Sequence, residues 1–171
     1  SKPFALLLDG VDLALHVAFV LNPTKDRARM TAVNLGGTRN FLAACERSGV
    51  KRVLAISSAT AHGAFADNPV PLRESHPVRC DQPFQYGREK AVMEGLIRQW
   101  GVFHPDVDVI IARPCIVIGP HVDNFISRSL SKTMVPLIGG ADPPMQFVHE
   151  DDVARATYVL AKRGKRGTYN I

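Results

Sequence analysis

Apolar residues in this chain fall into two alternating patterns. Short, mostly apolar runs cover residues 11–20, 53–57 and 107–112. Between them lie longer segments in which apolar residues recur at every third or fourth position. A short apolar run is typical of a strand that is covered on both faces in a parallel sheet, and the wider spacing is typical of an amphipathic helix. The pattern therefore predicts buried parallel strands separated by helices.

Two long helices are predicted. The first spans residues 24–48 and ends before Gly49, and its apolar face is formed by Met30, Val33, Gly37, Phe41, Ala44 and Cys45. Its Gly36-Gly37 pair costs about 1 kcal/mol per glycine relative to alanine in mid-helix. This cost indicates a close approach to a neighbouring backbone. The second helix spans residues 84–102 and ends before Pro105, with Ala91, Val92, Leu96 and Ile97 on its buried face.

The order of strand, helix and strand predicts an α/β fold with a doubly wound, Rossmann-like parallel sheet and right-handed crossovers. Residues 59–83 lack periodicity and are expected to form a long loop, which inside a compact domain is usually functional. Beyond residue 113 the apolar pattern is less regular. It predicts a short helix near residues 124–134, then a strand and a helix within 145–162 whose first turn is acidic, and a final strand at 167–171. We expect a core over residues 1–113 and a mixed region over 114–171 that is not an independent domain.

Charge gives little indication of a macromolecular partner. The 21 Lys and Arg residues exceed the 16 Asp and Glu residues and give a formal charge of +5, but the basic residues are scattered. Scattered charges are typical of solvated helix faces, so no nucleic-acid partner is expected. The basic balance would suit a phosphate-bearing cofactor or a small-molecule substrate.

The cysteines and the hydropathy predict the compartment. Cys45, Cys80 and Cys115 are widely spaced, and an odd number cannot pair fully. This argues against a disulfide scaffold or a zinc site and favours a reducing compartment. No apolar stretch approaches the ~20 residues that would span a bilayer, and no signal peptide opens the chain. We expect a soluble, cytoplasmic protein that has no membrane partner and binds no metal.

Candidate chemistry lies around the second strand and the second long helix. Tyr86 and Lys90 are four residues apart, so on a helix they share one face. A free phenol has a pKa of about 10, and a cation held beside it favours the phenolate and makes it a better general base. Ser58 follows the strand and could orient a substrate hydroxyl. These three residues would form a proton-transfer device for an alcohol and its ketone.

The same spacing occurs a second time, in Tyr158 and Lys162. Only Tyr86 follows a buried strand that ends in serines, so only there can a third polar group come alongside. We interpret Tyr158 and Lys162 as an ordinary pair on a helix surface.

Six segments together carry a family resemblance: LALHVAF, VNLGGTRNFL, ISSATAHG, YGREK, ARPCIVIGP and QFVHEDDVARA. In this order and spacing the chain resembles the middle of an extended short-chain dehydrogenase/reductase of the NAD-dependent epimerase/dehydratase group. The resemblance implies a Rossmann-type domain that binds NAD or NADP, and a smaller C-terminal part that shapes the substrate pocket. It also implies a homodimer formed through the helices of residues 24–48 and 84–102.

The resemblance assigns roles by position. Tyr86 matches the catalytic base, Lys90 the residue that lowers its pKa and holds the nicotinamide ribose, and Ser58 the hydroxyl that binds the substrate oxygen. Asn34 matches an asparagine beneath the lysine, although it could simply satisfy a helix irregularity. The remaining cofactor-binding positions are the strand end Val17, Ala18 and Phe19 and the loop residues Pro114 and Val117, whose apolar character would serve packing equally well.

The chemistry implied is hydride transfer between a nicotinamide and a secondary alcohol or ketone, with Tyr86 as general base and a nucleotide sugar as the expected substrate. Two alternatives remain open. One is a dehydrogenase or reductase of the steroid or flavonoid kind. The other is a non-catalytic relative that senses cofactor or serves as a scaffold.

Several departures from the family pattern limit this prediction. The glycine-rich turn that sets the pyrophosphate on a helix N-terminus is absent, so we expect a core fragment that lacks the first strands. Ala59 and Thr60 replace the acidic pair of sugar 4,6-dehydratases, which argues against water elimination. Ile116 replaces an asparagine of UDP-galactose-type epimerases, and His62 replaces the usual tyrosine before the loop glycine.

Overall fold

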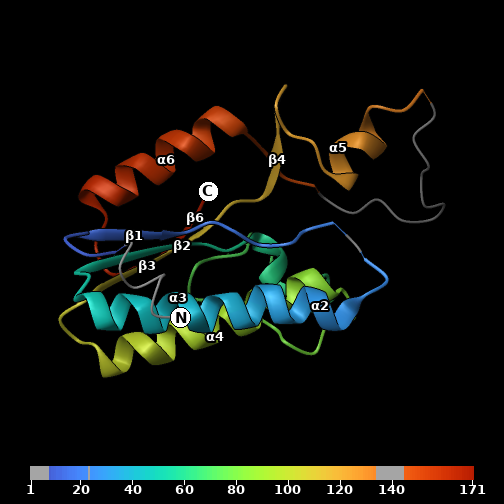
Figure 1. Ribbon diagram of the computed structural model, residues 1–171. Coiled ribbons are helices and arrows are strands. Elements are labelled where there is room, and N and C mark those ends of the chain that lie inside the picture. Colours follow the sequence, from blue (N-terminus) through green and yellow to red (C-terminus); the bar gives the residue numbers. More distant parts are fainter. Residues whose placement is uncertain (1–7, 23, 134–144) are drawn as a thin grey trace.

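A parallel sheet lies at the centre of the computed structural model, which describes residues 8–22, 24–133 and 145–171. Its strands in spatial order are β1 (Leu13–His16), β2 (Arg52–Ile56), β3 (Asp108–Arg113) and β6 (Gly167–Asn170). Helices α3 (Gly37–Ser48) and α4 (Gln85–Phe103) cover one face, and α6 (Glu150–Arg163) covers the other (Figure 1). The doubly wound α/β fold predicted from the sequence is confirmed.

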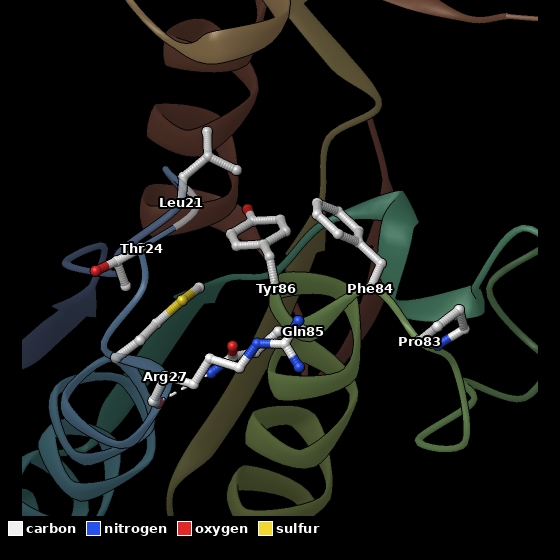
Figure 2. A pocket seen from close by; sticks show the side chains of 8 residues that line it. Leu21, Thr24, Arg27, Pro83, Phe84, Gln85 and Tyr86 are labelled. Carbon is white, nitrogen blue, oxygen red and sulfur yellow. Dashed lines mark hydrogen bonds between the residues drawn. The ribbon is translucent and has the colours of Figure 1, made fainter.

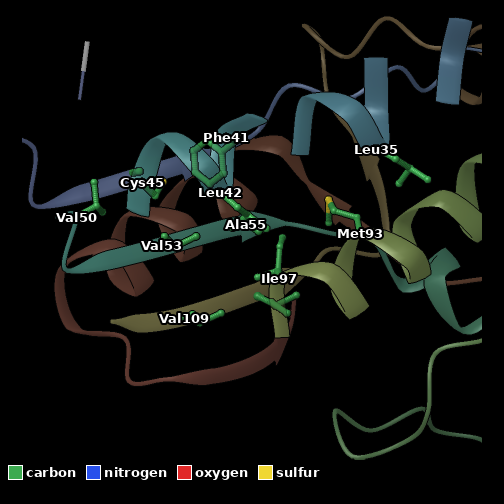
Figure 3. Close-up of a cluster of buried hydrophobic side chains, with 12 residues drawn as sticks. Leu35, Phe41, Leu42, Cys45, Val50, Val53, Ala55, Met93, Ile97 and Val109 are labelled. Atoms are coloured by element: carbon green, nitrogen blue, oxygen red, sulfur yellow. The ribbon is translucent and has the colours of Figure 1, made fainter. Parts of the chain in front are cut away.

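Both faces of the central strands are buried. Val53, Ala55 and Ile111 belong to the cluster that packs against α3 and α4 (Figure 3), whereas Leu54 and Ile110 belong to the cluster on the α6 side. Successive residues of a strand point to opposite faces of the sheet, so burial of both faces requires an apolar residue at every position. This requirement explains the continuous apolar runs in the sequence.

The first strand is shorter than its apolar run. Residues 11–20 were expected to be extended, but β1 ends at His16, and Val17 beyond it is 58% exposed. The backbone N–H of Val20 donates to Asn34 Oδ1 at 2.7 Å, and the Val20 carbonyl accepts from Asn34 Nδ2 at 3.1 Å. Residues 17–20 therefore leave the sheet, and an amide side chain takes the place of a neighbouring strand.

The first long helix contains a π-helical segment. Asp26 caps α2 (Arg27–Thr31), which continues through the π-helical η1 (Ala32–Gly36) into α3, and α3 ends at Gly49 with φ +65°. A Cβ atom added at Gly36 or Gly37 would meet nothing within 4 Å. The predicted close approach to a backbone is therefore wrong. The two glycines lie instead where the π-helical segment passes into α3.

The remaining elements follow the predicted order. The first four residues of the predicted loop over 59–83 form a 3₁₀ helix, η2 (Ala59–His62), which the sequence did not predict. Beyond β3 come β4 (Ile116–Ile118), α5 (Phe125–Leu130) and β5 (Phe147–His149). Helix α5 is shorter than predicted, and the predicted end at Met134 lies outside the described residues. Strands β4 and β5 form a separate small parallel sheet, whereas β6 extends the central sheet beyond the predicted boundary at residue 113.

Two further features concern α6 and the hydropathy. The first turn of α6 carries Glu150, Asp151 and Asp152, as predicted, and these complement the positive end of the helix dipole.

In the part of the chain that the structure describes, no helix combines the length and the apolar character needed to cross a bilayer.

Two glycines of α4 should respond oppositely to alanine. Gly95 is exposed and a Cβ there would meet nothing within 4 Å, whereas a Cβ at the buried Gly101 would lie 2.9 Å from Val109 Cγ2 of β3. Gly95→Ala should raise the free energy of unfolding by about 1 kcal/mol because alanine has the higher helix propensity. Gly101→Ala should lower it by about 1–3 kcal/mol through overpacking. Urea denaturation measures both, and equal effects would contradict the observed packing of α4 on β3.

Candidate active site

The predicted site residues gather where the parallel strands end. Ser58 follows β2, Tyr86 and Lys90 lie in the first turns of α4, and Phe19 follows β1. Lys90 Nζ lies 3.9 Å from the centre of the Phe19 ring and 5.6 Å from the centre of the Tyr86 ring. The carboxyl ends of the strands are the usual place for a ligand in such a sheet. The structure therefore brings together the serine, tyrosine and lysine singled out from the sequence.

Lys90 is buried against the end of β2. It is 2% exposed, and its amine donates a hydrogen bond of 2.7 Å to the carbonyl of Ile56. Burial lowers the pKa of Lys90 to about 7, and the negative charge of Glu94 opposes this shift. A large fraction of Lys90 is therefore a neutral amine at neutral pH.

Tyr86 is a neutral phenol in this arrangement. Its ring lies between those of Phe19 and Phe84, with centroid distances of 5.8 and 5.9 Å. Burial raises the pKa of Tyr86 to about 12, and a hydrogen bond with Ser58 opposes the rise. The expected lowering of this pKa by Lys90 does not occur in this arrangement.

Ser58 is held by Thr60, a residue that sequence reasoning considered only as a departure from the family. Ser58 Oγ accepts from Thr60 Oγ1 at 2.9 Å and from the Thr60 N–H at 3.2 Å. A serine hydroxyl has two acceptor sites and one proton, so its own O–H remains available as a donor. Gly87 lets α4 approach this loop, because a Cβ there would lie 2.7 Å from the carbonyl oxygen of Thr60.

Asn34 lies in the π-helical segment, and within the described residues its side chain binds Val20 and Glu89 and not the Lys90 amine. It is 1% exposed, and besides holding Val20 it donates to Glu89 Oε2 at 2.7 Å. Glu89 Oε1 accepts from Thr31 Oγ1 at 2.5 Å and from Gln85 Nε2 at 2.8 Å. Glu89 thus ties α4 to the first long helix, a role that its place inside YGREK did not reveal.

A second buried carboxylate, Glu94, ties α4 to the sheet. Arg113 Nε and Nη2 donate to the two oxygens of Glu94 at 2.8 and 2.7 Å, and both side chains are at most 1% exposed. Burial alone would raise the pKa of Glu94, but the hydrogen bonds from Arg113 hold it below its ordinary value. Sequence reasoning missed this pair, although an arginine that ends a buried strand required a partner.

His62 belongs to the same buried cluster and is 1% exposed. Its Nε2 lies 3.1 Å from Arg113 Nη1, and its Nδ1 lies 3.0 Å from the carbonyl oxygen of Pro77. A guanidinium can only donate, so Nε2 accepts and the proton sits on Nδ1. Burial lowers the pKa of His62, and the charge of Arg113 acts in the same direction. His62 is therefore a neutral link between β3 and the long loop.

The remaining positions predicted to bind the cofactor follow β1 and β3 or lie in β4. Val17 and Ala18 present an exposed apolar strand end, the buried Pro114 follows β3, and the partly buried Val117 lies in β4. Of the residues that follow β1, Phe19 packs against the Tyr86 ring and the Lys90 amine. An apolar side chain beside a phenol and an amine suits a planar ring with an attached ribose. The chain contains no G-x-G-x-x-G segment, the motif that sets a pyrophosphate on a helix N-terminus.

A cavity of about 150 Å³ opens beside Tyr86. Figure 2 shows Leu21, Thr24 and Arg27 on one side and Phe84, Gln85 and Tyr86 on the other. By contrast, Tyr158 of the second motif copy is 65% exposed on α6. The two copies of the motif therefore differ in their surroundings, as expected from the sequence.

Removal of one member of the Glu94–Arg113 pair should be costly. Arg113→Met would leave the buried Glu94 carboxylate with the half-exposed Arg98, 3.2 Å away on the same helix, as its ion-pair partner, and should lower the free energy of unfolding by about 3–5 kcal/mol. Arg113→Met combined with Glu94→Leu removes both charges and should restore a large part of that loss. Urea denaturation of the single and double variants gives the coupling energy, and strictly additive losses would contradict a direct pair.

Stability should fall in mild acid because His16 is buried as a neutral ring. Burial lowers the pKa of His16 to about 4, and the charge of Lys90 adds to the shift. The unfolded chain binds this proton near pH 6.5, so the contribution is complete above pH 6.5 and is lost as the pH falls toward 4. The loss should be on the order of 3 kcal/mol.

The control for this prediction is a histidine on the surface. His16→Gln should reduce the dependence of the unfolding free energy on pH between 6.5 and 4, leaving a contribution of His62 in the same direction. His121→Gln, which replaces a ring with a side chain 87% exposed, serves as the comparison. An unchanged slope in His16→Gln would show that other groups cause the acid sensitivity.

Comparison with known proteins gives matches along nearly the whole chain. An uncharacterized protein of Mycobacterium tuberculosis is 33% identical over 94% of this chain and 44% of its own length. The GDP-6-deoxy-D-mannose reductase of Pseudomonas aeruginosa and sterol demethylase protein B of Methylococcus capsulatus are each 30% identical over 94% of this chain, and over 57% and 49% of their own lengths. The chain thus spans about half the length of the curated relatives it matches.

Solved structures agree in fold. The dTDP-glucose 4,6-dehydratase DesIV of Streptomyces venezuelae, solved as a double mutant with NAD, has a TM-score of 0.83 and 25% identity over 99% of this chain and 54% of its own. RMD of Pseudomonas aeruginosa with NADPH has a TM-score of 0.76 and 27% identity over 94% and 60%. MoeE5 with UDP-glucuronic acid and NAD has a TM-score of 0.81 and 25% identity over 98% and 58%.

The model of the NAD dependent epimerase/dehydratase family matches residues 6–171. The resemblance stated from six short segments is therefore confirmed, and the expected cofactor, NAD or NADP, agrees with a family that is NAD-dependent and with neighbours solved with NAD or NADPH. The chain belongs to the NAD-dependent epimerase/dehydratase family.

Proposed function

We propose that the chain carries the catalytic site of an NAD(P)-dependent oxidoreductase or epimerase that acts on a secondary alcohol or ketone of a nucleotide sugar. The convergence of Ser58, Tyr86 and Lys90 at the carboxyl end of β2 carries this proposal. Relatives and neighbours that act on or bind nucleotide sugars support the substrate class. The exposed apolar strand end at Val17 supports the place of the nicotinamide.

In this proposal Ser58, Tyr86 and Lys90 have distinct roles in the reaction. Ser58 Oγ donates to that oxygen and fixes its position beside the phenol. Tyr86 Oη holds the proton that leaves the hydroxyl on oxidation and returns it on reduction. Lys90, in its protonated form, favours the phenolate of Tyr86 and holds the ribose. The nicotinamide, when bound, accepts or returns the hydride of the carbon that bears this oxygen.

Water elimination is not part of the proposal. Residues 59 and 60 are alanine and threonine, and the Thr60 hydroxyl is already occupied as a donor to Ser58. No carboxylate therefore stands at these two positions to act as acid or base, although DesIV, a dehydratase, shares the fold.

Two observations favour alternatives. The pKa of Tyr86, raised by burial to about 12, suits a non-catalytic relative that senses a cofactor. The match to sterol demethylase protein B, at the same identity as the match to the reductase, suits a dehydrogenase of the steroid kind. A homodimer through the helices of residues 24–48 and 84–102 and a cytoplasmic location stay predictions from the sequence.

The test combines cofactor binding with turnover. NAD, NADH, NADP and NADPH are titrated in turn while the melting temperature is followed, and one pair should stabilise the chain saturably. Reduction or oxidation of that cofactor is then measured with UDP-, GDP- and dTDP-sugars. Tyr86→Phe should lower kcat by about 10²–10⁴-fold, the usual contribution of a positioned base, and keep the stabilisation by cofactor.

The second motif copy supplies the matched control. Tyr158→Phe makes the same chemical change at an exposed site and should leave both turnover and cofactor binding unchanged. Turnover retained by Tyr86→Phe would overturn the enzyme proposal. Saturable cofactor binding without turnover of any of these sugars would instead favour the sensor, and turnover confined to a sterol would favour the steroid-type alternative.

A further inference from the structure

The cavity beside Tyr86 has one cationic wall. It is bounded by the segment that follows β1 and by the first turn of α4, and Tyr86 itself forms part of its wall (Figure 2). At about 150 Å³ it has room for a small substituent and not for a nucleotide. A group that enters it is therefore attached close to the carbon that reacts at the phenol.

Arg27 supplies the charge of this cavity. Its side chain extends toward α4 (Figure 2), and no carboxylate among the described residues lies within ion-pair distance of it. The acidic neighbour Asp26 caps α2 by accepting from the Arg29 N–H at 2.9 Å. Thr24 adds a hydroxyl to the same wall. The residues that line the cavity thus offer hydrogen-bond donors to an anion, and no carboxylate among them would repel it.

Hydrogen bonds between α4 and the first long helix hold the backbone of Arg27 near Tyr86. Gln85 Nε2 donates to the backbone carbonyl of Arg27 at 3.1 Å and to Glu89 Oε1 at 2.8 Å. Glu89 also accepts from Thr31, one turn after Arg27. Both oxygens of Glu89 are occupied in this way or by Asn34, so Glu89 anchors the two walls and does not compete for the guanidinium.

We propose that this cavity is a subsite for an oxyanion of the substrate, with Arg27 as the residue that binds it and a carboxylate on the reacting sugar ring as the group that fits. A guanidinium presents two parallel N–H donors that match a carboxylate, and this pairing is stronger and more directional than a neutral hydrogen bond. The inference rests on the proposed function for its substrate class, a nucleotide sugar. Arg27 would make that enzyme prefer a sugar acid over the neutral sugar.

The test uses UDP-glucuronate, UDP-glucose and UDP as probes, titrated calorimetrically into the 171-residue chain at low salt. UDP-glucuronate and UDP-glucose differ by a carboxylate in place of a hydroxymethyl group, so the comparison isolates that group. UDP-glucuronate should bind at least about tenfold tighter than UDP-glucose, which corresponds to about 1.4 kcal/mol. Arg27→Gln should remove this difference and leave the affinity for UDP-glucose within about twofold.

Arg29→Gln is the matched control, because Arg29 lies on the same short helix and does not line the cavity. It should change none of the three affinities by more than about twofold. Equal weakening of all three probes by Arg27→Gln would assign Arg27 to the diphosphate and overturn the carboxylate assignment. No preference for UDP-glucuronate, or no binding of it at millimolar concentration, would overturn the subsite altogether.

The outcomes separate this inference from the proposed function. A preference for UDP-glucuronate that depends on Arg27, in a chain that no nicotinamide cofactor stabilises, would support the subsite and overturn the oxidoreductase. Turnover of neutral nucleotide sugars that depends on Tyr86 and is unaffected by Arg27→Gln would support the oxidoreductase and overturn the subsite.

Discussion

The buried ion pair between Glu94 and Arg113 determines where α4 lies on the sheet. The Glu94 carboxylate is 0% exposed, and Arg98 of the same helix reaches one of its oxygens, so burial is favourable where Arg113 at the end of β3 binds both oxygens. Lys90 and Tyr86 lie one and two turns earlier on the same helix. The pair therefore places the catalytic candidates opposite the end of β2, although neither member faces the cavity.

The same arginine reaches into the loop that follows η2. Arg113 Nη1 contacts His62 Nε2 and donates to the Glu74 carbonyl at 3.3 Å, and Glu74 in turn accepts from the Asn170 N–H of β6. Gln82 adds hydrogen bonds to the carbonyls of Thr60 and Arg79. A loop of this length would otherwise be costly to order, so these polar anchors explain how it stays close to the site.

Elements whose apolar pattern is complete were predictable from the sequence. Strands β2 and β3 and helix α4 lie within a residue or two of their predicted ranges, because burial on one or both faces leaves a clear period. The run at residues 11–20 was read as one strand because Val17 and Ala18 are apolar for another reason, namely exposure at a candidate ligand site. Periodicity in the sequence cannot distinguish an apolar residue that packs in the core from an exposed apolar residue at a ligand site.

Hydrogen bonds and ion pairs between residues far apart in the sequence could not be predicted from local sequence patterns. The Gly36-Gly37 pair indicated an irregular helix, but its cause is a π-helical segment in which Asn34 turns inward to hold Val20. Glu89 and Glu94 look like ordinary helix-surface glutamates in the sequence, yet both are almost fully buried. Their partners, Thr31 and Arg113, are 58 and 19 residues away, so only the folded chain reveals the pairs.

Burial from solvent determines the charge states of Lys90 and Tyr86 in this structure. Burial moves the pKa of Lys90 down to about 7 and that of Tyr86 up to about 12, so both side chains are pushed toward their neutral forms. A general base needs the opposite, a phenolate beside an ammonium. Glu94 already opposes the shift of Lys90, and Ser58 already opposes the shift of Tyr86. Further donors at the phenol oxygen, or further acceptors at the amine, would act in the same two directions. The hydroxyls of a bound substrate and ribose are groups of this kind, so in the proposed enzyme the base would be completed by the molecules on which it acts.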